Sequence, residues 1–299
     1  MSRIVADRVS LTVPATSANL GAGFDSLGLA LDLRDRVIVR AVAGESRVVV
    51  RGEGAETVGL GEDHLVVRAI RIGLEYVDAP QIGIDLVCHN SIPHARGLGS
   101  SAAAAVVGLV AARELVSEPD ALDEPTILQL ATDLEGHPDN AAPALFGGAT
   151  LAWMEDGRAR ALRLQVSESV QPVALIPPTT ASTSGARAAL PRTIPHADAV
   201  FNLQRSALMV EALRTGDPDL LFTATDDALH QPYRAEVMGE SLELVASLRS
   251  RGVAAALSGA GPTVLAFARP DEALTAALVR HGWKVLPLPI AAEGVRLGV

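Results

Sequence analysis

The feature that most constrains this chain is a glycine-containing loop between a strand pattern and an alanine-rich helix pattern. A strand expected near 82–88 leads into Ile92-Pro93-His94-Ala95-Arg96-Gly97-Leu98-Gly99-Ser100-Ser101-Ala102-Ala103-Ala104, and a helix is expected from about 100 to 116. Glycines let a ligand approach the backbone closely, and a helix that begins in the loop offers unpaired N–H groups and a positive dipole end. The junction therefore suits phosphate without any lysine. An ordinary loop-to-helix junction capped by serine is the alternative.

The basic residues exclude several classes of phosphate-binding enzyme. Of the 25 Lys and Arg residues, 24 are Arg, and the single lysine is Lys284 near the C-terminus. A P-loop needs a lysine directly after its glycines, and a protein kinase needs a strand lysine upstream of its catalytic loop. Neither requirement is met here, so any phosphate site in this chain differs from both.

Charge, cysteine content and hydropathy limit the kinds of partner that this chain can have. The 35 acidic residues against 25 basic ones give a net charge of −10, which argues against a nucleic-acid-binding surface. One cysteine, Cys88, excludes an intrachain disulfide and a multi-cysteine zinc site. The uncharged run 97–112 is shorter than the roughly 20 residues of a membrane span, and no signal-peptide core opens the chain. We expect a cytoplasmic protein with no nucleic-acid or membrane partner.

Hydrophobic periodicity predicts mixed strands and helices without regular βαβ alternation, which favours an α+β fold. Strands are expected at 3–13, 35–42, 46–51, 82–88, 148–154, 159–164, 171–176, within 253–267 and at 283–289, and helices at 64–77, 100–116, 125–135, 196–215, 218–229, 238–251 and 271–281. The weakest boundary lies near 165–170, so we expect domains at 1–165 and 166–299.

Three segments together resemble the motifs of the GHMP kinases. Pro93 to Ala103 resembles the ATP-binding motif of that family, and Leu257-Ser258-Gly259-Ala260-Gly261-Pro262-Thr263-Val264 resembles its third motif. Near the N-terminus, Pro14-Ala15-Thr16-Ser17-Ala18-Asn19-Leu20-Gly21-Ala22-Gly23-Phe24-Asp25-Ser26-Leu27-Gly28 resembles the first motif, in the form found in members that phosphorylate L-homoserine. The motifs occur in the family's order and span most of the chain.

This resemblance implies a fold, a reaction and a cofactor. The fold is the two-domain GHMP kinase fold, with an N-terminal ribosomal-S5-like part and a C-terminal ferredoxin-like part. The reaction is ATP-dependent phosphorylation of the L-homoserine side-chain hydroxyl to O-phospho-L-homoserine, in threonine biosynthesis, with Mg²⁺. The family also implies a homodimer. The residues expected to bind ATP are Pro93, His94, Ala95, Arg96, Gly97, Leu98, Gly99, Ser100, Ser101, Ala102, Ala103, Gly259 and Gly261.

An acidic group follows the predicted helix 125–135 in Glu135-Gly136-His137-Pro138-Asp139-Asn140. An acid in the last helical turn opposes the helix dipole unless a positive group compensates, and magnesium with oxygens from Glu135 and Ser101 would do so. A solvated acid at a helix end is the alternative. By the family match, Glu135 binds the metal, whereas His137 and Asp139 face the substrate. Asn140 cannot accept a proton at neutral pH, so we hypothesise that it orients the attacking hydroxyl.

A zwitterionic amino acid needs an acid for its ammonium group and arginines for its carboxylate. We expect Asp25, in a glycine-rich loop, to hold the ammonium group with Asp139. The residues expected to bind the substrate are Asn19, Asp25, His137, Asp139, Thr183, Arg187 and Arg234, and all of them except Asp25 are carried over from the family resemblance. Relatives often have Asn before the hydrophobic pair near the adenine, where this chain has His64, so the contacts of His64 with adenine are left open.

Other classes of function fit less well. Gly21-Ala22-Gly23-Phe24-Asp25-Ser26 lacks the third glycine of a dinucleotide fingerprint, no G-x-S-x-G elbow accompanies the serines, and the seven histidines form no H-E-x-x-H pair. Two alternatives remain: a GHMP kinase acting on another small alcohol such as mevalonate, and a catalytically silent protein that binds ATP and an amino acid. Mevalonate has no ammonium group, so it would leave Asp25 and Asp139 without a partner.

Overall fold

The computed structural model describes residues 2–298, apart from the side chain of Thr183. The larger of its two β-sheets is built mainly from the N-terminal half of the chain. Its strand order is β11-β1-β2-β4-β3, and β5 pairs with both β2 and β6. Neighbouring strands are antiparallel except for the parallel pair β3 and β4. The strands are β1 (Arg8–Asn19), β2 (Gly23–Val42), β3 (Arg47–Gly52), β4 (Gly83–Asn90), β5 (Ala149–Glu155), β6 (Arg158–Leu164) and β11 (Arg296–Leu297).

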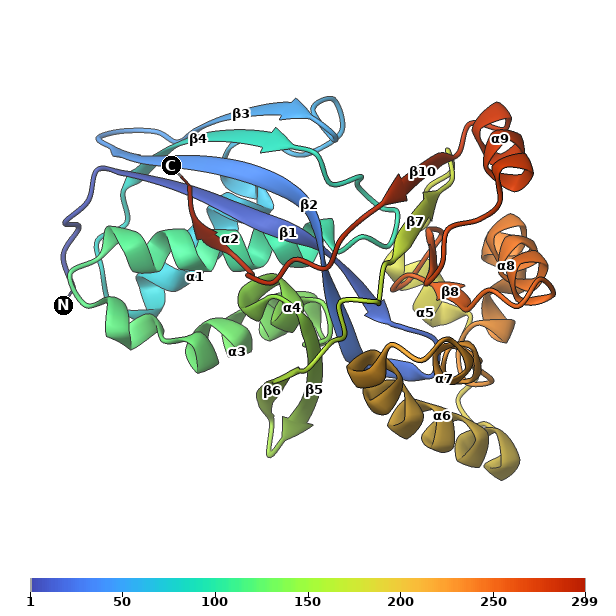
Figure 1. Cartoon of the computed structure of the whole chain (residues 1–299). Coiled ribbons are helices and arrows are strands. Elements are labelled where there is room, and N and C mark those ends of the chain that lie inside the picture. The colour runs from blue at the N-terminus through green and yellow to red at the C-terminus, as the bar shows by residue number, and fades with distance from the viewer. Residues whose placement is uncertain (1, 299) are drawn as a thin grey trace.

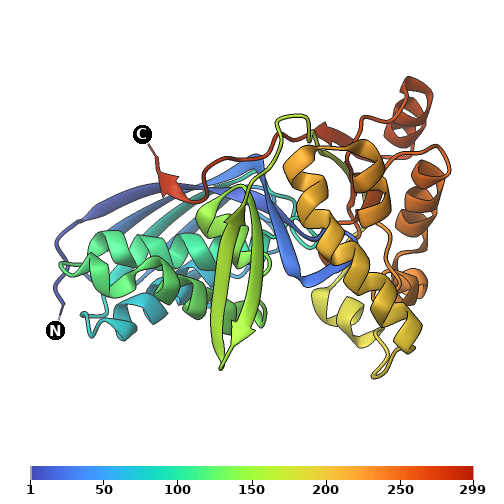
Figure 2. The ribbon, with the colours of Figure 1, turned by 60° about the horizontal axis from the view of Figure 1, so that its bottom comes forward.

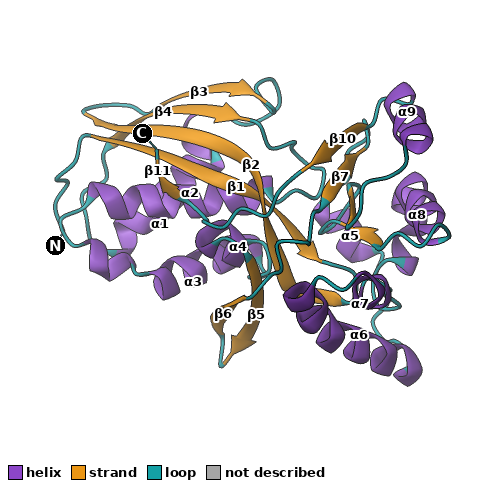
Figure 3. Ribbon diagram, in the orientation of Figure 1, coloured by secondary structure: helices purple, strands orange, loops and turns teal. Residues whose placement is uncertain are grey.

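Helices cover one face of this sheet, as Figures 1 and 3 show. They are α1 (Leu65–Tyr76), α2 (Ser100–Leu115), α3 (Glu124–Glu135) and α4 (Ala141–Phe146), with 3₁₀ turns η1 (Gly61–Asp63) and η2 (Pro119–Leu122). Small residues allow α1 and α2 to approach closely, because a Cβ atom on Gly73 would lie 2.6 Å from Ala112 and one on Gly108 would lie 2.6 Å from Ala69. This explains the alanine-rich sequence of α2, most of which is buried.

The C-terminal half contains a four-stranded antiparallel sheet in the order β10-β7-β9-β8. Its strands are β7 (Val173–Ile176), β8 (Ala255–Leu257), β9 (Val264–Ala266) and β10 (Lys284–Pro287). The helices are α5 (Thr183–Ala188), α6 (His196–Thr215), α7 (Pro218–Ala224), α8 (Ala235–Arg249) and α9 (Glu272–Arg280), with the 3₁₀ turn η3 (Pro232–Arg234). This sheet and its helices form the second lobe, which Figure 2 shows from another side.

The two lobes meet around the turn between β1 and β2. Figure 1 shows both strands running from the first lobe into the second. There the Ala18 carbonyl accepts a hydrogen bond from Gly259 N at 3.0 Å, and the Gly21 carbonyl lies 2.8 Å from His230 Nε2. The chain also crosses back to the first lobe at its C-terminal end, where β11 pairs with β1. The expected domain boundary between residues 165 and 166 stays a prediction.

The sequence-based expectation of an α+β fold is confirmed, and each predicted helix and strand overlaps an observed one. One prediction was wrong in detail: Asp25, expected in a glycine-rich loop, lies near the start of β2, which begins at Gly23 rather than near residue 35. The glycines and the polar Asp25 and Ser26 hide this half of the strand from a periodicity argument. Three short elements, α4, α5 and β11, were not predicted because two to six residues carry no clear period.

Candidate active site

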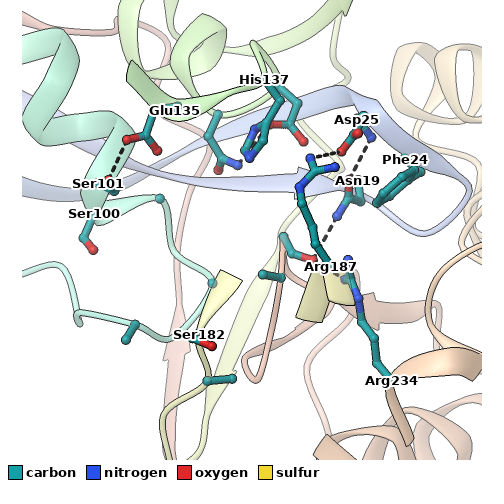
Figure 4. Close-up of a pocket in the computed structure, with 18 of the residues that line it drawn as sticks. Asn19, Phe24, Asp25, Ser100, Ser101, Glu135, His137, Ser182, Arg187 and Arg234 are labelled. Atoms are coloured by element: carbon teal, nitrogen blue, oxygen red, sulfur yellow. Dashed lines mark hydrogen bonds and ion pairs between the residues drawn. The ribbon is translucent and has the colours of Figure 1, made fainter. Parts of the chain in front are cut away.

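A cavity of about 450 Å³ lies between the two lobes and gathers most of the predicted site residues. Figure 4 shows Ser100, Ser101 and Glu135 on one side, and Asp25, Arg187 and Arg234 on the other. The lining residues are Asn19, Phe24, Asp25, Ala95, Gly97, Gly99, Ser100, Ser101, Leu134, Glu135, His137, Asp139, Asn140, Ala181, Ser182, Arg187, Arg234, Gly259 and Ala260. The three sequence motifs, far apart along the chain, therefore meet at one cavity.

The glycine loop reaches this cavity with its backbone. Gly99 caps α2 with φ 66°, so the first N–H groups of that helix lie at the cavity wall without intrahelical partners. A Cβ atom on Gly97 would overlap the Ser258 carbonyl, and one on Gly99 would overlap Thr16 Oγ1. Both positions therefore require glycine, and the loop can present its backbone to a ligand in the cavity. That this ligand is a phosphate stays a prediction.

A second cavity of about 350 Å³ adjoins the first, because Ala95, Ser100 and Ser101 line both. Its other lining residues are largely apolar or buried: Val13, Asp35, Val37, Val58, Gly59, Asp63, His64, Leu65, Val66, Cys88, Asn90, His94, Ala104 and Val107. A largely apolar pocket next to a phosphate loop has the character of a site for a nucleotide base.

Ser101 and Glu135 are in direct contact. Ser101 Oγ donates a hydrogen bond to Glu135 Oε1 at 2.6 Å, which joins the first turn of α2 to the last residue of α3. Burial raises the pKa of Glu135, and the hydrogen bond from Ser101 partly offsets that effect. Among residues 2–298, no group of three or more His, Cys, Asp or Glu side chains could enclose a metal ion. Two adjacent oxygens facing a phosphate loop instead match the small protein contribution that Mg²⁺ needs when phosphates supply further ligands.

His137, Asp139 and Asn140 form a hydrogen-bonded chain beside the cavity. His137 Nδ1 lies 2.6 Å from Asp139 Oδ1, and this bond raises the pKa of His137. Asn140 Nδ2 donates to Asp139 Oδ1 at 3.2 Å, while Asn140 Oδ1 accepts from Thr16 Oγ1 at 2.7 Å. The Asn140 amide is thus held at both ends, which suits an orienting group.

Asp25 and Arg187 form an ion pair at one end of the cavity, with Arg187 Nη2 2.8 Å from Asp25 Oδ1. Asn19 Oδ1 accepts from Asp25 N at 3.0 Å, and both residues have left-handed backbones, with φ 71° at Asn19 and 55° at Asp25. Such conformations persist in non-glycine residues when surrounding contacts hold them. Asp25 is therefore held opposite an arginine, as the binding of a zwitterion requires.

The second arginine, Arg234, is 2% exposed and comes from η3. Its Nη1 donates to the Gly259 carbonyl at 3.0 Å, and the same carbonyl accepts from Asn19 Nδ2 at 2.9 Å. Arg234 Nε is buried without a hydrogen-bond partner, and burial lowers the pKa of the guanidinium group. A guanidinium group that lines the cavity is suited to an incoming carboxylate.

Phe24 lies among these charged groups. Its ring stacks on His230 at 5.0 Å between centroids, and the guanidinium carbons of Arg187 and Arg234 lie 5.7 Å and 5.9 Å from its centroid. The ring therefore lies within cation–π distance of both arginines and also stacks on the buried imidazole. Sequence reasoning missed Phe24, although it precedes Asp25 in the quoted first motif.

Some predicted ATP-binding residues support the loop without lining either cavity: Pro93, Arg96, Leu98, Ala102, Ala103 and Gly261. Arg96 donates to the carbonyls of Pro177 and Pro178 and so ties the loop to the second lobe. Thr183 begins α5, and its side chain lies outside the described part of the chain. Sequence reasoning also missed Thr16 and Ser182, since a threonine in a strand and a serine at a helix cap look structural.

Comparison with known proteins identifies the family. Residues 64–148 match the family model described as GHMP kinases N terminal domain, and residues 209–281 match GHMP kinases C terminal. Together these regions make up a little over half of the chain. The chain belongs to the GHMP kinase family.

Relatives that match over nearly the full length narrow the family assignment to one branch of the GHMP kinases. The chain is 49% identical over 290 residues to a homoserine kinase of Streptomyces avermitilis, covering 96% of this chain and 94% of that protein. It is 48% identical over 297 residues to a homoserine kinase of Corynebacterium glutamicum, covering 96% and 95%. Within the GHMP kinases, the chain belongs with the homoserine kinases.

Solved structures agree with the fold. The crystal structure of homoserine kinase from Cytophaga hutchinsonii matches with a TM-score of 0.83 and 26% identity, covering 98% of both chains. The mevalonate diphosphate decarboxylase of Enterococcus faecalis shares the fold with a TM-score of 0.66 at 18% identity. In the described region, 2–298, every helix is too short or too polar to cross a membrane.

Proposed function

We propose that this chain transfers the γ-phosphoryl group of ATP to the side-chain hydroxyl of L-homoserine and releases O-phospho-L-homoserine, a step of threonine biosynthesis. The observation that carries this proposal is that one acid, Asp25, lies with two arginines, Arg187 and Arg234, at one end of a cavity whose other end is a phosphate loop; Asp25 is ion-paired with Arg187. The two ends of the cavity therefore differ in the charges they offer: one end suits a zwitterion and the other suits a polyphosphate.

ATP fits the two adjoining cavities. The phosphates lie against the N-terminus of α2 and the backbone around Gly97 and Gly99, while the base occupies the apolar cavity. Ser101 and Glu135 would hold Mg²⁺, which when bound neutralises charge on the transferring phosphoryl group. The negative net charge of the chain is no obstacle, since backbone dipoles supply the local positive potential.

The amino acid binds by exchanging partners with the Asp25–Arg187 ion pair. Its ammonium group takes Asp25, with Asp139 nearby, and its carboxylate takes the guanidinium groups of Arg187 and Arg234, which both line the cavity. Asn140, fixed by Thr16 and Asp139, orients the hydroxyl toward the γ-phosphate. No base is required in this account, because the loose transition state of phosphoryl transfer depends on positioning and charge stabilisation.

Substrate analogues and two variants test this arrangement. We expect Asp25→Asn and Arg234→Gln to raise KM for homoserine on the order of 10- to 100-fold with little change in KM for ATP, since each loses a charge-assisted hydrogen bond. 4-Hydroxybutanoate, which lacks the ammonium group, should be a poor substrate for the unchanged protein and should differ less from homoserine in Asp25→Asn. Equal use of both compounds by the unchanged protein would overturn the proposed orientation. Binding of ATP and homoserine without ADP release would support the silent binding protein instead.

We also propose, from the family, a homodimer in the cytoplasm. Light scattering on the purified chain tests the first part: a mass near twice the 31.0 kDa of the chain supports it, and a mass near 31.0 kDa contradicts it.

A further inference from the structure

The larger sheet has one face that the helices of the first lobe leave open. On the covered face, Val39 of β2, Leu86 of β4 and their neighbours on the same side are buried in the hydrophobic core. In the described chain, the opposite side of β1 to β4 carries no helix (Figure 1). Side chains alternate between the two faces of a strand, so the residues between the buried ones point outward. The open face is defined as the outward residues within 8–12, 36–40, 85–89 and 47–51.

The first row across the open face is rich in arginine. It consists of Arg8, Arg40, Asp85 and Arg47, which are successive partners in the strand register. The three arginines are exposed, and within residues 2–298 none of them has an ion pair or a side-chain hydrogen bond. Arg8 and Arg40 lie directly opposite each other, and like charges in that arrangement cost stability. The row therefore holds positive charge that the fold itself does not use.

A second cationic row lies on the other side of the open face. It consists of Thr12, Arg36, His89 and Arg51, again in register, and it contains no acid. Arg51 is exposed and makes no ion pair with any described residue. Four residues separate the two rows along each strand, which corresponds to about 13 Å. In a chain with a net charge of −10, these rows concentrate the opposite sign on one side of one sheet.

The row between the cations is mostly apolar. It consists of Ser10, Ile38, Val87 and Val49, and Val49 is 44% exposed. None of these residues is aromatic, whereas sheets that bind single-stranded nucleic acid stack the bases on aromatic side chains. The same face of a second copy would bring arginines against arginines. The ligand that fits this face is therefore acidic on two sides and apolar between them.

We propose that the open face binds an acidic amphipathic helix of a partner protein. The helix lies across the strands, with its apolar stripe on the central row and its carboxylates toward the two outer rows. A helix with its side chains is about 10 to 12 Å wide, close to the spacing of the outer rows. Arginine pairs with carboxylates through two parallel hydrogen bonds, so Arg40 and Arg51 can hold the helix from opposite sides. The arginines of this face line neither cavity, so the inference goes beyond the proposed function and does not depend on it.

A synthetic stapled helix tests the inference on the unchanged full chain. The peptide has about 14 residues and is about 20 Å long, with leucine at spacings of three and four and glutamate on both sides of that stripe. Fluorescence anisotropy at low salt should give a Kd on the order of 10 μM. The same peptide with glutamine in place of glutamate should bind at least about 10-fold more weakly. Equal binding of the two peptides, or no binding of the acidic one at about 1 mM, would overturn the proposal.

Charge reversal on the open face should remove this binding. We expect Arg51→Glu to weaken the acidic peptide on the order of 10-fold or more, because attraction becomes repulsion. Arg158→Glu is the matched control, since Arg158 is an exposed arginine on β6 of the same sheet, lies outside the open face and gives the same change in net charge. Equal losses in the two variants would show that only the net charge matters and would contradict a site. Thermal unfolding of both variants confirms that they are folded.

Two further variants test the apolar row and the arginine pair. Val49→Ser keeps every charge and should weaken the acidic peptide by about 3-fold or more, because it removes exposed apolar surface from the central row. Unchanged binding in Val49→Ser would contradict an apolar stripe. Arg8→Gln should weaken binding without lowering the unfolding temperature, because it also relieves the opposed charges of Arg8 and Arg40. A lower unfolding temperature with unchanged binding would show that Arg8 has a structural role instead.

Competition decides among other occupants of the open face. Phosphatidylglycerol vesicles and single-stranded oligothymidylate should displace the labelled peptide less effectively than unlabelled peptide does. More effective displacement by either would assign the face to a membrane or to nucleic acid and contradict the proposal. Light scattering on the chain alone tests a second copy: a dimer that Arg51→Glu converts to the monomer would assign the face to self-association and also contradict it.

Discussion

Ser101 Oγ donates a hydrogen bond to Glu135 Oε1 at 2.6 Å, and this contact brings the start of α2 and the end of α3 together at the phosphate loop. The two residues lie 34 positions apart, at the ends of two different helices. Their contact gives the cavity two oxygens in the position where the phosphates of ATP are expected.

The Glu135→Gln variant should lose activity because it replaces one of these two oxygens with a weaker ligand. An amide oxygen is a weaker ligand for Mg²⁺ than a carboxylate, so we expect kcat/KM to fall on the order of 100-fold or more. Steady-state ADP release at several magnesium concentrations measures the effect. Asp133→Asn is the matched control, since Asp133 lies in the same turn of α3, bonds to Gln129 and lines neither cavity. A change below 3-fold in Glu135→Gln would rule out a metal role for Glu135.

Asn140 should matter for orientation rather than proton transfer. We expect Asn140→Ala to lower kcat about 10-fold, less than the 100- to 10,000-fold typical of losing a general base. Thr16→Val, which frees the Asn140 amide oxygen, should lower kcat in the same direction by a smaller factor. Single-turnover rates at saturating ATP and homoserine give the comparison. A loss in Asn140→Ala as complete as that in Glu135→Ala would show that orientation alone is too weak an account.

Gly99 should not tolerate a side chain. A Cβ atom there would overlap Thr16 Oγ1 and its φ of 66° is unfavourable for alanine, so Gly99→Ala should displace the loop and abolish ATP binding. Gly157→Ala is the control: its φ is 76°, but nothing lies within 4 Å of the added carbon, so it should lose about 1 kcal/mol of stability and keep ATP binding. Calorimetric titration with ATP and urea unfolding separate the two effects. Equal ATP affinity in both variants would contradict a backbone phosphate site.

Asp35 makes the stability of the unliganded protein depend on pH. Its pKa rises from 3.8 to about 6 on folding because of burial, so the folded chain binds more protons between these values. The free energy of unfolding should therefore decrease as the pH rises through this window, by about 3 kcal/mol from this group. Asp35→Asn removes the effect, so its stability relative to the unchanged protein should increase between pH 4 and 7. Urea unfolding at intervals of one pH unit measures this difference, and a constant difference would contradict the burial of a charge.

Site residues that stand in a local motif could be predicted from the sequence, whereas residues whose role depends on long-range contacts could not. Ser101 and Glu135 were predicted because each stands at a helix end inside a specific motif. Thr16 was not, because its contact with Asn140 joins positions 124 residues apart and a strand threonine gives no local signal. The role of Arg234 was carried over from the family, but its burial depends on the Gly259 turn, which only the folded chain brings near. Asp35 looked like an ordinary polar residue until strand pairing placed it beside the apolar cavity.

The most direct test of the account is ADP release by the purified chain with homoserine, mevalonate, shikimate and galactose in parallel, each with ATP and magnesium. We predict rapid turnover with homoserine, with O-phospho-L-homoserine identified by mass spectrometry, and turnover near background with the other three. Turnover with mevalonate but not with homoserine would contradict the account, because mevalonate offers no ammonium group to Asp25.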